Sequence, residues 1–194
     1  RSDLVRQELA DAQHVEFAEQ TEQLGTGHAV MMCRAQLTDQ EGPTVIVTGD
    51  SPLLQSSSVA ALVDHYRRQQ PACALGVVRA ADPGGLGRIV RDEAGRFVGI
   101  VEEKDATDEQ RAIDEVNAST YLFDTQRLLW SLDQLTNQNA QNEYYVTDCP
   151  AILLAAGDPV DALNVLKPCE ALSINSVDDL RAVEAEIERL AATP

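Results

Sequence analysis

Asp50 stands close behind an apolar run of the sequence, TVIV at residues 44–47. A carboxylate in that place suits Mg²⁺, which takes one or two protein oxygens together with waters and substrate phosphates. An Asx-type turn before Ser51 and Pro52 explains the residue equally well on spacing alone. Asp50 is therefore a candidate metal ligand with a plain structural alternative.

A glycine-bearing segment, QTEQLGTGHA at residues 20–29, leads into an expected helix. Backbone N–H groups at such a turn can face a ligand, and a helix N-terminus favours an anion. The Gln20 side chain offers a donor and an acceptor, which match the imide edge of uracil. A plain strand-to-helix turn is the commoner explanation of such a segment, and we expect His28 to cap or pack rather than to catalyse.

Three further polar positions are weaker candidates for a ligand site. Asn is depleted inside strands, so Asn117 indicates either a ligand contact or a β-bulge. Glu102 opens the charge run EEKD, for which a solvated turn is the default explanation. Asn175 precedes a helix cap at Ser176, where turn chemistry suffices. The glycines at positions 84, 85 and 87 lack the GxGxxG spacing of a dinucleotide site.

The 194 residues carry a formal net charge of −17, from 32 acidic and 15 basic side chains, and 44% of them are hydrophobic. This composition predicts a soluble globular chain with one sizeable core. The acidity argues against nucleic acid or an anionic membrane as partner, because both need clustered Lys and Arg. No apolar run approaches the roughly 18 residues of a spanning helix, and the first residues do not resemble a signal peptide. The four cysteines form no CxxC pair, which favours reduced thiols in a cytoplasmic protein.

Strand and helix patterns alternate along the chain, which predicts an α/β fold around a largely parallel sheet. Strands are expected at residues 14–17, 44–47, 72–79, 88–90, 97–102, 116–123, 162–166 and 172–174, with a hairpin formed by 88–90 and 97–102. Helices are expected at residues 2–12, 29–37, 59–66, 126–135 and 147–156, and from Ser176 onward. We expect the run at 44–47 to be buried on both faces. Ligands of such sheets bind beyond the carboxyl ends of the strands, which is where the candidate residues stand.

Taken in order, several blocks of the chain resemble one enzyme family. The blocks are EQLGTGHA (22–29), GDxPL (49–53), DPxGxGRI (82–89), IVExKDATDEQ (100–110) and NxNAQxEYYxTD (137–148), followed by Asn175. They are similar to the uridyltransferase domain of bacterial N-acetylglucosamine-1-phosphate uridyltransferases, usually the first half of a bifunctional protein that also acetylates glucosamine 1-phosphate. The similarity covers nearly the whole chain.

The resemblance implies a Rossmann-like nucleotidyltransferase fold, that of sugar-nucleotide pyrophosphorylases, with a mixed, mainly parallel sheet. It implies Mg²⁺-dependent transfer of UMP from UTP to N-acetylglucosamine 1-phosphate, giving UDP-N-acetylglucosamine, a cell-wall precursor, and pyrophosphate. By matching of the blocks, the resemblance implies that Gln20 and the backbone of Gly25 and Thr26 bind the uracil, and that Asp50 and Asn175 bind Mg²⁺. It implies an amino-sugar pocket formed by Gly87, Glu102 and Asn117. Thr48 and Gly49 are then expected near the ribose and sugar.

The chain departs from the family pattern in three places. The Gly-rich signature LAAGxGTRM and the Lys after it are expected upstream of Arg1, so residues 1–194 should form one nucleotidyltransferase domain without its first strand, and should be inactive alone. Thr48 replaces a common Tyr, and Asn117-Ala118-Ser119 replaces Asn-Thr-Gly. A different sugar 1-phosphate is therefore an alternative substrate, and a non-catalytic nucleotide-sugar-binding protein is the alternative function. The oligomeric state stays open, a homo-oligomer included.

Overall fold

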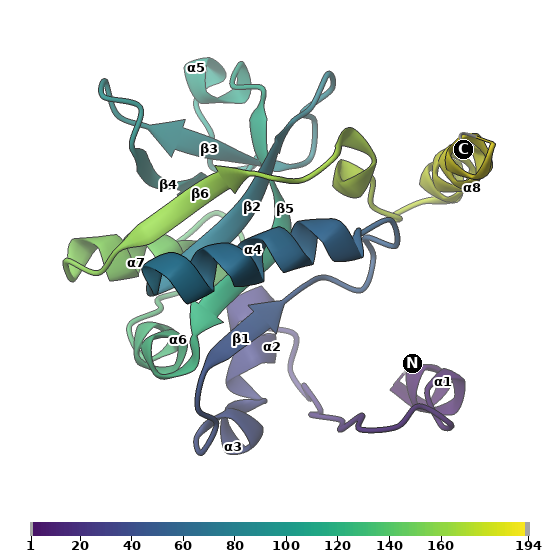
Figure 1. The fold of residues 1–194 in the computed structure, drawn as a ribbon, viewed down its shortest axis with the longest axis horizontal. Coiled ribbons are helices and arrows are strands. Elements are labelled where there is room, and N and C mark those ends of the chain that lie inside the picture. Colours follow the sequence, from purple (N-terminus) through teal and green to yellow (C-terminus); the bar gives the residue numbers. More distant parts are fainter. Residues whose placement is uncertain (1, 193–194) are drawn as a thin grey trace.

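A computed structural model describes residues 2–192 of the chain (Figure 1). The helices are α1 (Ser2–Glu8), α2 (Thr26–Met31), α3 (Arg34–Leu37), α4 (Ser56–Gln69), α5 (Asp108–Arg111), α6 (Thr125–Leu132), α7 (Cys149–Ala155) and α8 (Val177–Ala191), with short 3-10 turns η1 (Val146–Asp148) and η2 (Pro168–Ala171). The strands are β1 (Pro43–Ile46), β2 (Cys73–Arg79), β3 (Gly87–Arg91), β4 (Phe97–Val101), β5 (Glu115–Asp124) and β6 (Val160–Asn164).

The long strand β5 organises the sheet, in which the strands run in the order β4-β3-β5-β2-β6. One edge of β5 pairs with β2 along its length. Its other edge is shared, because β3 pairs with the beginning of β5 and β1 with its end. The residues that follow β1 and those that begin β3 are therefore attached to the same central strand.

The sheet is mixed, as expected, but the expectation that it is mainly parallel is wrong for its strand pairings. Only β2 and β6 pair in parallel within residues 2–192, whereas β5 runs antiparallel to β1, β2 and β3. The alternation of helix and strand patterns along the chain does not predict that a later strand lies between earlier ones and runs in the opposite direction. The expected hairpin is confirmed as the antiparallel pair β3–β4.

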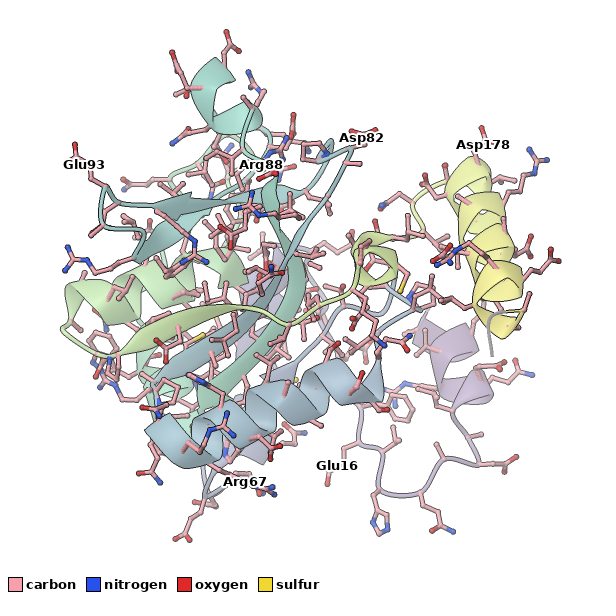
Figure 2. All side chains as sticks on the ribbon, turned by 45° about the horizontal axis from the view of Figure 1, so that its top comes forward. Glu16, Arg67, Asp82, Arg88, Glu93 and Asp178 are labelled. Atoms are coloured by element: carbon pink, nitrogen blue, oxygen red, sulfur yellow. The ribbon has the colours of Figure 1, made fainter. Side chains whose placement is uncertain are left out.

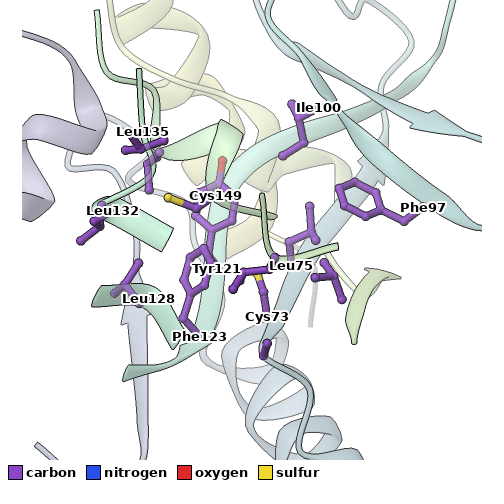
Figure 3. Close-up of a cluster of buried hydrophobic side chains, with 14 of the residues drawn as sticks. Cys73, Leu75, Phe97, Ile100, Tyr121, Phe123, Leu128, Leu132, Leu135 and Cys149 are labelled. Atoms are coloured by element: carbon purple, nitrogen blue, oxygen red, sulfur yellow. The ribbon is translucent and has the colours of Figure 1, made fainter. Parts of the chain in front are cut away.

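Helices cover both faces of the sheet and produce a layered core. On one face α4 packs Leu62 against Ala74 of β2 and Leu122 of β5. The neighbouring β5 residues Tyr121 and Phe123 point to the opposite face, where α6 and α7 enclose the larger hydrophobic cluster (Figure 3). This alternation along β5 is the period of two that a strand between two helical layers requires.

Several apolar residues near the beginning of the chain are exposed. The helix α1 contributes no buried residue, and Val45 and Val47 are 40% and 46% exposed. The expectation of a doubly buried strand at 44–47 is therefore wrong, because β1 is paired on one edge only in the part of the chain that the structure describes. Residues 14–17 form no strand, since no described segment pairs with them, and residues 172–174 also stay outside the sheet.

The structure shows the state of the cysteines and the character of the helices. All four cysteines are free thiols, and Cys73, Cys149 and Cys169 are buried. Among residues 2–192, no helix combines the length and the apolar character that crossing a membrane needs.

Candidate active site

Three neighbouring strands bring Gly87, Glu102 and Asn117 together. Gly87 at the beginning of β3 lies opposite Asn117 of β5, and Glu102 directly follows β4, the other neighbour of β3. A Cβ atom added to Gly87 would lie 3.7 Å from the Cβ of Asn117 and 3.7 Å from Oε2 of Glu102. Gly87 thus leaves a space between the side chains of Glu102 and Asn117, and any side chain at position 87 would fill part of that space.

Asn117 begins a β-bulge in β5. The facing strand β2 pairs with Asn117 and Thr120 and skips residues 118–119, and Ser119 adopts a positive φ of 53°. The Asn117 Oδ1 accepts a hydrogen bond from the Ser119 N–H at 3.1 Å, and its Nδ2 donates to the Tyr121 hydroxyl at 2.6 Å. The bulge explanation of Asn117 is confirmed, and bulges of this kind re-aim side chains beside active sites.

Glu102 is half-buried rather than part of a solvated turn. Its Oε1 accepts a hydrogen bond from the Thr147 hydroxyl at 2.8 Å. Burial raises the pKa of the Glu102 carboxyl, the Thr147 hydrogen bond opposes this rise, and the nearby Asp105 charge adds to it. Burial likewise raises the pKa of Asp148, helped by the charges of Glu102 and Asp105. The carboxylate of Glu102 is therefore held at a fixed place in poorly solvated surroundings.

A buried ion pair ties β3 to the end of β4 beside this carboxylate. The Arg88 guanidinium lies 2.7 Å from Oε2 of Glu103 and is 2% exposed. It also donates to the backbone carbonyls of Leu86 and Arg111. Arg88 lies among the ribbons, whereas Glu93 and Asp178 project outward (Figure 2). The Arg88–Glu103 ion pair thus connects the residues that directly follow Gly87 and Glu102 in the sequence.

Asp50 and Asn175 approach each other through their backbones. The Ile174 N–H donates to the Asp50 carbonyl at 2.9 Å. Within residues 2–192 the Asp50 carboxylate has no hydrogen-bond or ion-pair partner, so the Asx-type turn is absent. The Asn175 Nδ2 donates to Ser173 Oγ at 3.1 Å, which leaves its Oδ1 available.

Asp50 and Asn175 offer a metal ion one carboxylate and one amide group. The described residues contain no group of three His, Cys, Asp or Glu side chains that could hold one. One carboxylate oxygen and one amide oxygen still fit Mg²⁺, which keeps several waters and completes its shell with substrate phosphates. The same set would be too poor for a structural zinc site, which needs four protein ligands.

The segment with Gln20 and Gly25 docks on residues 144–146. Gly25 has a φ of 105°, and a Cβ atom there would lie 2.6 Å from the Tyr144 carbonyl oxygen, so only glycine fits. The Gln20 Nε2 lies 3.1 Å from the Gly25 carbonyl and 3.0 Å from Nδ1 of His28, whose ring lies 6.4 Å from that of Tyr144. Thr26 Oγ1 accepts from the backbone N–H of residue 146 at 3.1 Å.

A cavity of about 270 Å³ joins these segments. Of the residues singled out from the sequence, it is lined by Thr26, Thr48, Asp50, Gly87, Glu102, Asn117 and Asn175. Gln20, Gly25 and Gly49 are not among its lining residues. The sequence reasoning missed Thr147 and Ser173, which also line it, as does Ser119, noted above only as a departure from the family pattern. Thr147 belongs to the sequence block at 137–148, so the family resemblance could have identified it, whereas Ser173 belongs to none of the blocks.

A larger hollow of about 780 Å³ lies between β4 and β6. Its ionic side chains are paired with each other or with buried acids: Arg91 with Glu115, Arg96 with Asp92 and His65 with Asp161. The smaller cavity, whose polar groups are in part unpaired, is the better candidate for the active site.

The fold and this cavity define a class of protein. A model of the Nucleotidyl transferase family matches residues 1–166, and the chain belongs to that family. The structure of a UDP-glucose pyrophosphorylase complexed with UDP-glucose superposes with a TM-score of 0.64 over 96% of this chain and 73% of that one, at 14% sequence identity. This likeness shows that the Rossmann-like nucleotidyltransferase fold is present.

Particular relatives are more similar in sequence. The chain is 43% identical over 168 residues to the "Bifunctional protein GlmU" of Streptococcus equi subsp. zooepidemicus, which covers 87% of this chain and 36% of the relative. It is 41% identical over 188 residues to the protein of that name from Brevibacillus brevis, covering 97% of this chain and 40% of the relative. The chain thus spans about two fifths of the length of these curated relatives.

Proposed function

We propose that the protein transfers UMP from UTP to N-acetylglucosamine 1-phosphate, releasing pyrophosphate and UDP-N-acetylglucosamine for cell-wall synthesis. The observation that carries the proposal is the meeting of two residue groups in one cavity. Gly87, Glu102 and Asn117 come from paired strands, and Asp50 and Asn175 come from two loops joined by a backbone hydrogen bond. The first group suits a sugar and the second suits phosphates with their metal ion.

The reaction needs positioned groups rather than an enzyme nucleophile. A phosphate oxygen of the sugar phosphate attacks the α-phosphorus of UTP in line, and the bond to the leaving pyrophosphate breaks. Glu102 accepts hydrogen bonds from sugar hydroxyls, and Asn117 offers an amide N–H. The backbone of Gly25 and Thr26, with the Gln20 amide, binds the uracil.

Asp50 and Asn175 hold Mg²⁺ in this proposal, with Thr48 and Gly49 beside the ribose and sugar. The bound ion supplies positive charge to the reacting phosphates. This matters in a chain with a net charge of −17, because both substrates are anions. The unpartnered Asp50 carboxylate and the available Asn175 Oδ1 support the assignment.

We further propose that residues 1–194 belong to one nucleotidyltransferase domain that works in the cytoplasm. The free thiols of all four cysteines support a reducing compartment. The expectation of a Gly-rich loop upstream stays a prediction, since the structure describes residues 2–192.

The test is an assay of the full-length protein with UTP and a panel of sugar 1-phosphates. We expect pyrophosphate release and UDP-N-acetylglucosamine, with N-acetylglucosamine 1-phosphate the best acceptor and with activity lost in chelator and restored by Mg²⁺. The 194-residue chain alone should release no pyrophosphate. A better rate with another sugar would favour the alternative substrate, which the Thr48 and Ser119 departures support. Binding of UDP-sugar without turnover would favour the non-catalytic alternative.

A further inference from the structure

The Asn117 amide in the cavity is held in one orientation. Its Oδ1 receives the Ser119 N–H, which can only donate, and its Nδ2 donates one of its two hydrogens to the Tyr121 hydroxyl. If the amide were flipped, Nδ2 would face the Ser119 N–H, donor against donor. The bulge therefore selects the rotamer in which Asn117 offers the cavity a donor.

Tyr121 combines a packed ring with a hydroxyl that contacts Asn117, one of the residues lining the cavity. The residue is fully buried, and its ring lies in the main cluster, 5.9 Å from the ring of Phe123 (Figure 3). The ring provides the hydrophobic contacts, and the hydroxyl makes the polar contacts, with Asn117 at 2.6 Å and with the Ser119 side chain. Packing and polar contact can thus be separated by removing a single oxygen atom.

We propose that Tyr121 is a positioning residue that selects the acceptor sugar, because its hydroxyl holds Asn117 so that the second amide N–H is left for the substrate. That N–H has no partner within residues 2–192. This N–H would donate a hydrogen bond to an acceptor oxygen of the sugar, such as an acetamido carbonyl. It would disfavour a charged amine in the same place, because an amine of that kind can only donate. The inference rests on the proposed function and deepens it.

The bulge itself shows why the amide needs this support. Ser119 occupies the left-handed region, which costs a residue other than glycine roughly 1 kcal/mol or more. The hydrogen bond from the Ser119 N–H to Asn117 offsets part of that cost. Without the Tyr121 hydroxyl, the buried Nδ2 would lose its partner, and the amide would be free to turn away from the cavity.

Tyr121→Phe in the full-length protein tests the proposal, with Tyr66→Phe as the matched control. The Tyr66 hydroxyl likewise takes part in hydrogen bonding, donating to Asp124 at 3.3 Å, but belongs to α4 on the other face of the sheet. We expect Tyr121→Phe to raise the KM for N-acetylglucosamine 1-phosphate about five- to tenfold, the worth of one such hydrogen bond, and to change the KM for UTP less than about twofold. Discrimination against glucosamine 1-phosphate should fall in parallel, and Tyr66→Phe should change neither quantity.

A double-mutant cycle separates positioning from a merely structural effect. In an Asn117→Ala background, Tyr121→Phe should leave the KM for the sugar phosphate unchanged, because nothing remains to be positioned. Equal effects in both backgrounds, or an equal rise in both KM values, would overturn the proposal. If Tyr121→Phe does not fold, Asn117→Asp replaces the donor by an acceptor while keeping the Ser119 bond, and an unchanged KM there would overturn it too.

A crystal structure of Tyr121→Phe separates this inference from the proposed function. If the unmodified protein forms no UDP-N-acetylglucosamine, the proposed function fails. The positioning claim is then still decided by the Asn117 amide, which should be turned or disordered in the variant. An amide in the unchanged place would contradict the claim.

Discussion

The two halves of the candidate site are built in different ways. Gly87 and Asn117 are buried residues of paired strands, and Glu102 follows a third strand that an ion pair ties to its neighbour. Asp50 and Asn175 are exposed loop residues, joined by the single hydrogen bond from Ile174 to the Asp50 carbonyl. We call the first group the strand side and the second the loop side.

The strand side is already formed in the absence of substrate. On the strand side, register and packing fix the places of the polar groups, and reorganisation would break a ladder of hydrogen bonds. On the loop side, the Asp50 carboxylate and the Asn175 Oδ1 have no hydrogen-bond partner among residues 2–192, as the proposed binding of a metal ion with its phosphates requires. We therefore expect changes on the strand side to affect sugar affinity and stability, and changes on the loop side to affect turnover.

The largest effect is expected from Asp50→Ala in the full-length protein. The loss of the only acidic side chain on the loop side should lower the rate of UDP-N-acetylglucosamine formation by about a thousandfold. The melting temperature should stay unchanged, because the carboxylate has no protein partner within residues 2–192. Full activity of this variant would refute the metal assignment.

A smaller and differently placed effect is expected from Gly87→Ala. The new methyl group would lie 2.9 Å from Cγ2 of Ile100 and in contact with Glu102 and Asn117. We expect the KM for the sugar phosphate to rise about tenfold, since the methyl group fills part of the space between them, while the KM for UTP changes little. Steady-state kinetics with each substrate varied in turn measure both. A loss confined to kcat would contradict the separation of the two sides.

The hairpin that supports the strand side can be probed through two ion pairs. Arg88→Met removes a guanidinium that is 2% exposed and leaves Glu103 only its longer contact with Arg111, at 3.7 Å, so the free energy of unfolding should fall by about 2–3 kcal/mol. Arg96→Met removes the exposed partner of Asp92 on the same hairpin and should cost less than about 1 kcal/mol. Urea unfolding of the two variants gives both values. Equal losses would mean that the buried pair does not hold the hairpin.

The smallest effect concerns the stability of the strand side at different pH values. Burial raises the pKa of Glu102 in the folded chain above its ordinary value of 4.5, so the folded state is penalised once the carboxyl ionises. Glu102→Gln should therefore raise the melting temperature at about pH 7, and this gain should vanish below the ordinary pKa, at about pH 4, where the carboxyl is protonated in both states. Glu109→Gln, at an exposed position of α5, is the control and should change neither. A gain that persists at about pH 4 would contradict the burial argument.

Local patterns predicted many elements of this fold well. Ser176 caps α8 in a capping box with Asp179, and the α7 helix ends before Gly157, which has a φ of 87°. Such features depend on neighbours in the sequence, so spacing is enough to find them. The reversed insertion of β5 between β2 and its other partners could not be predicted, because it depends on pairings between distant segments.

The motif blocks predicted which residues lie at the candidate site, but not which side chains contact each other there. Seven of the ten candidate residues line one cavity. No local pattern indicates that Thr147 holds Glu102, or that Tyr121 holds Asn117, since each bond needs the tertiary arrangement. The exposure of Val45 is a further case, because burial of an apolar run depends on what packs on it.

The Mg²⁺ dependence of UDP-N-acetylglucosamine formation tests most directly whether the two sides act separately. It is measured in the full-length protein for Asp50→Asn and Gly87→Ala, with the sugar phosphate KM determined in parallel. We predict that Asp50→Asn raises the Mg²⁺ concentration for half-maximal rate about tenfold or more and leaves the sugar phosphate KM near its original value. Gly87→Ala should do the reverse. Variants that shift both quantities to the same extent would contradict a metal-binding loop side and a sugar-binding strand side.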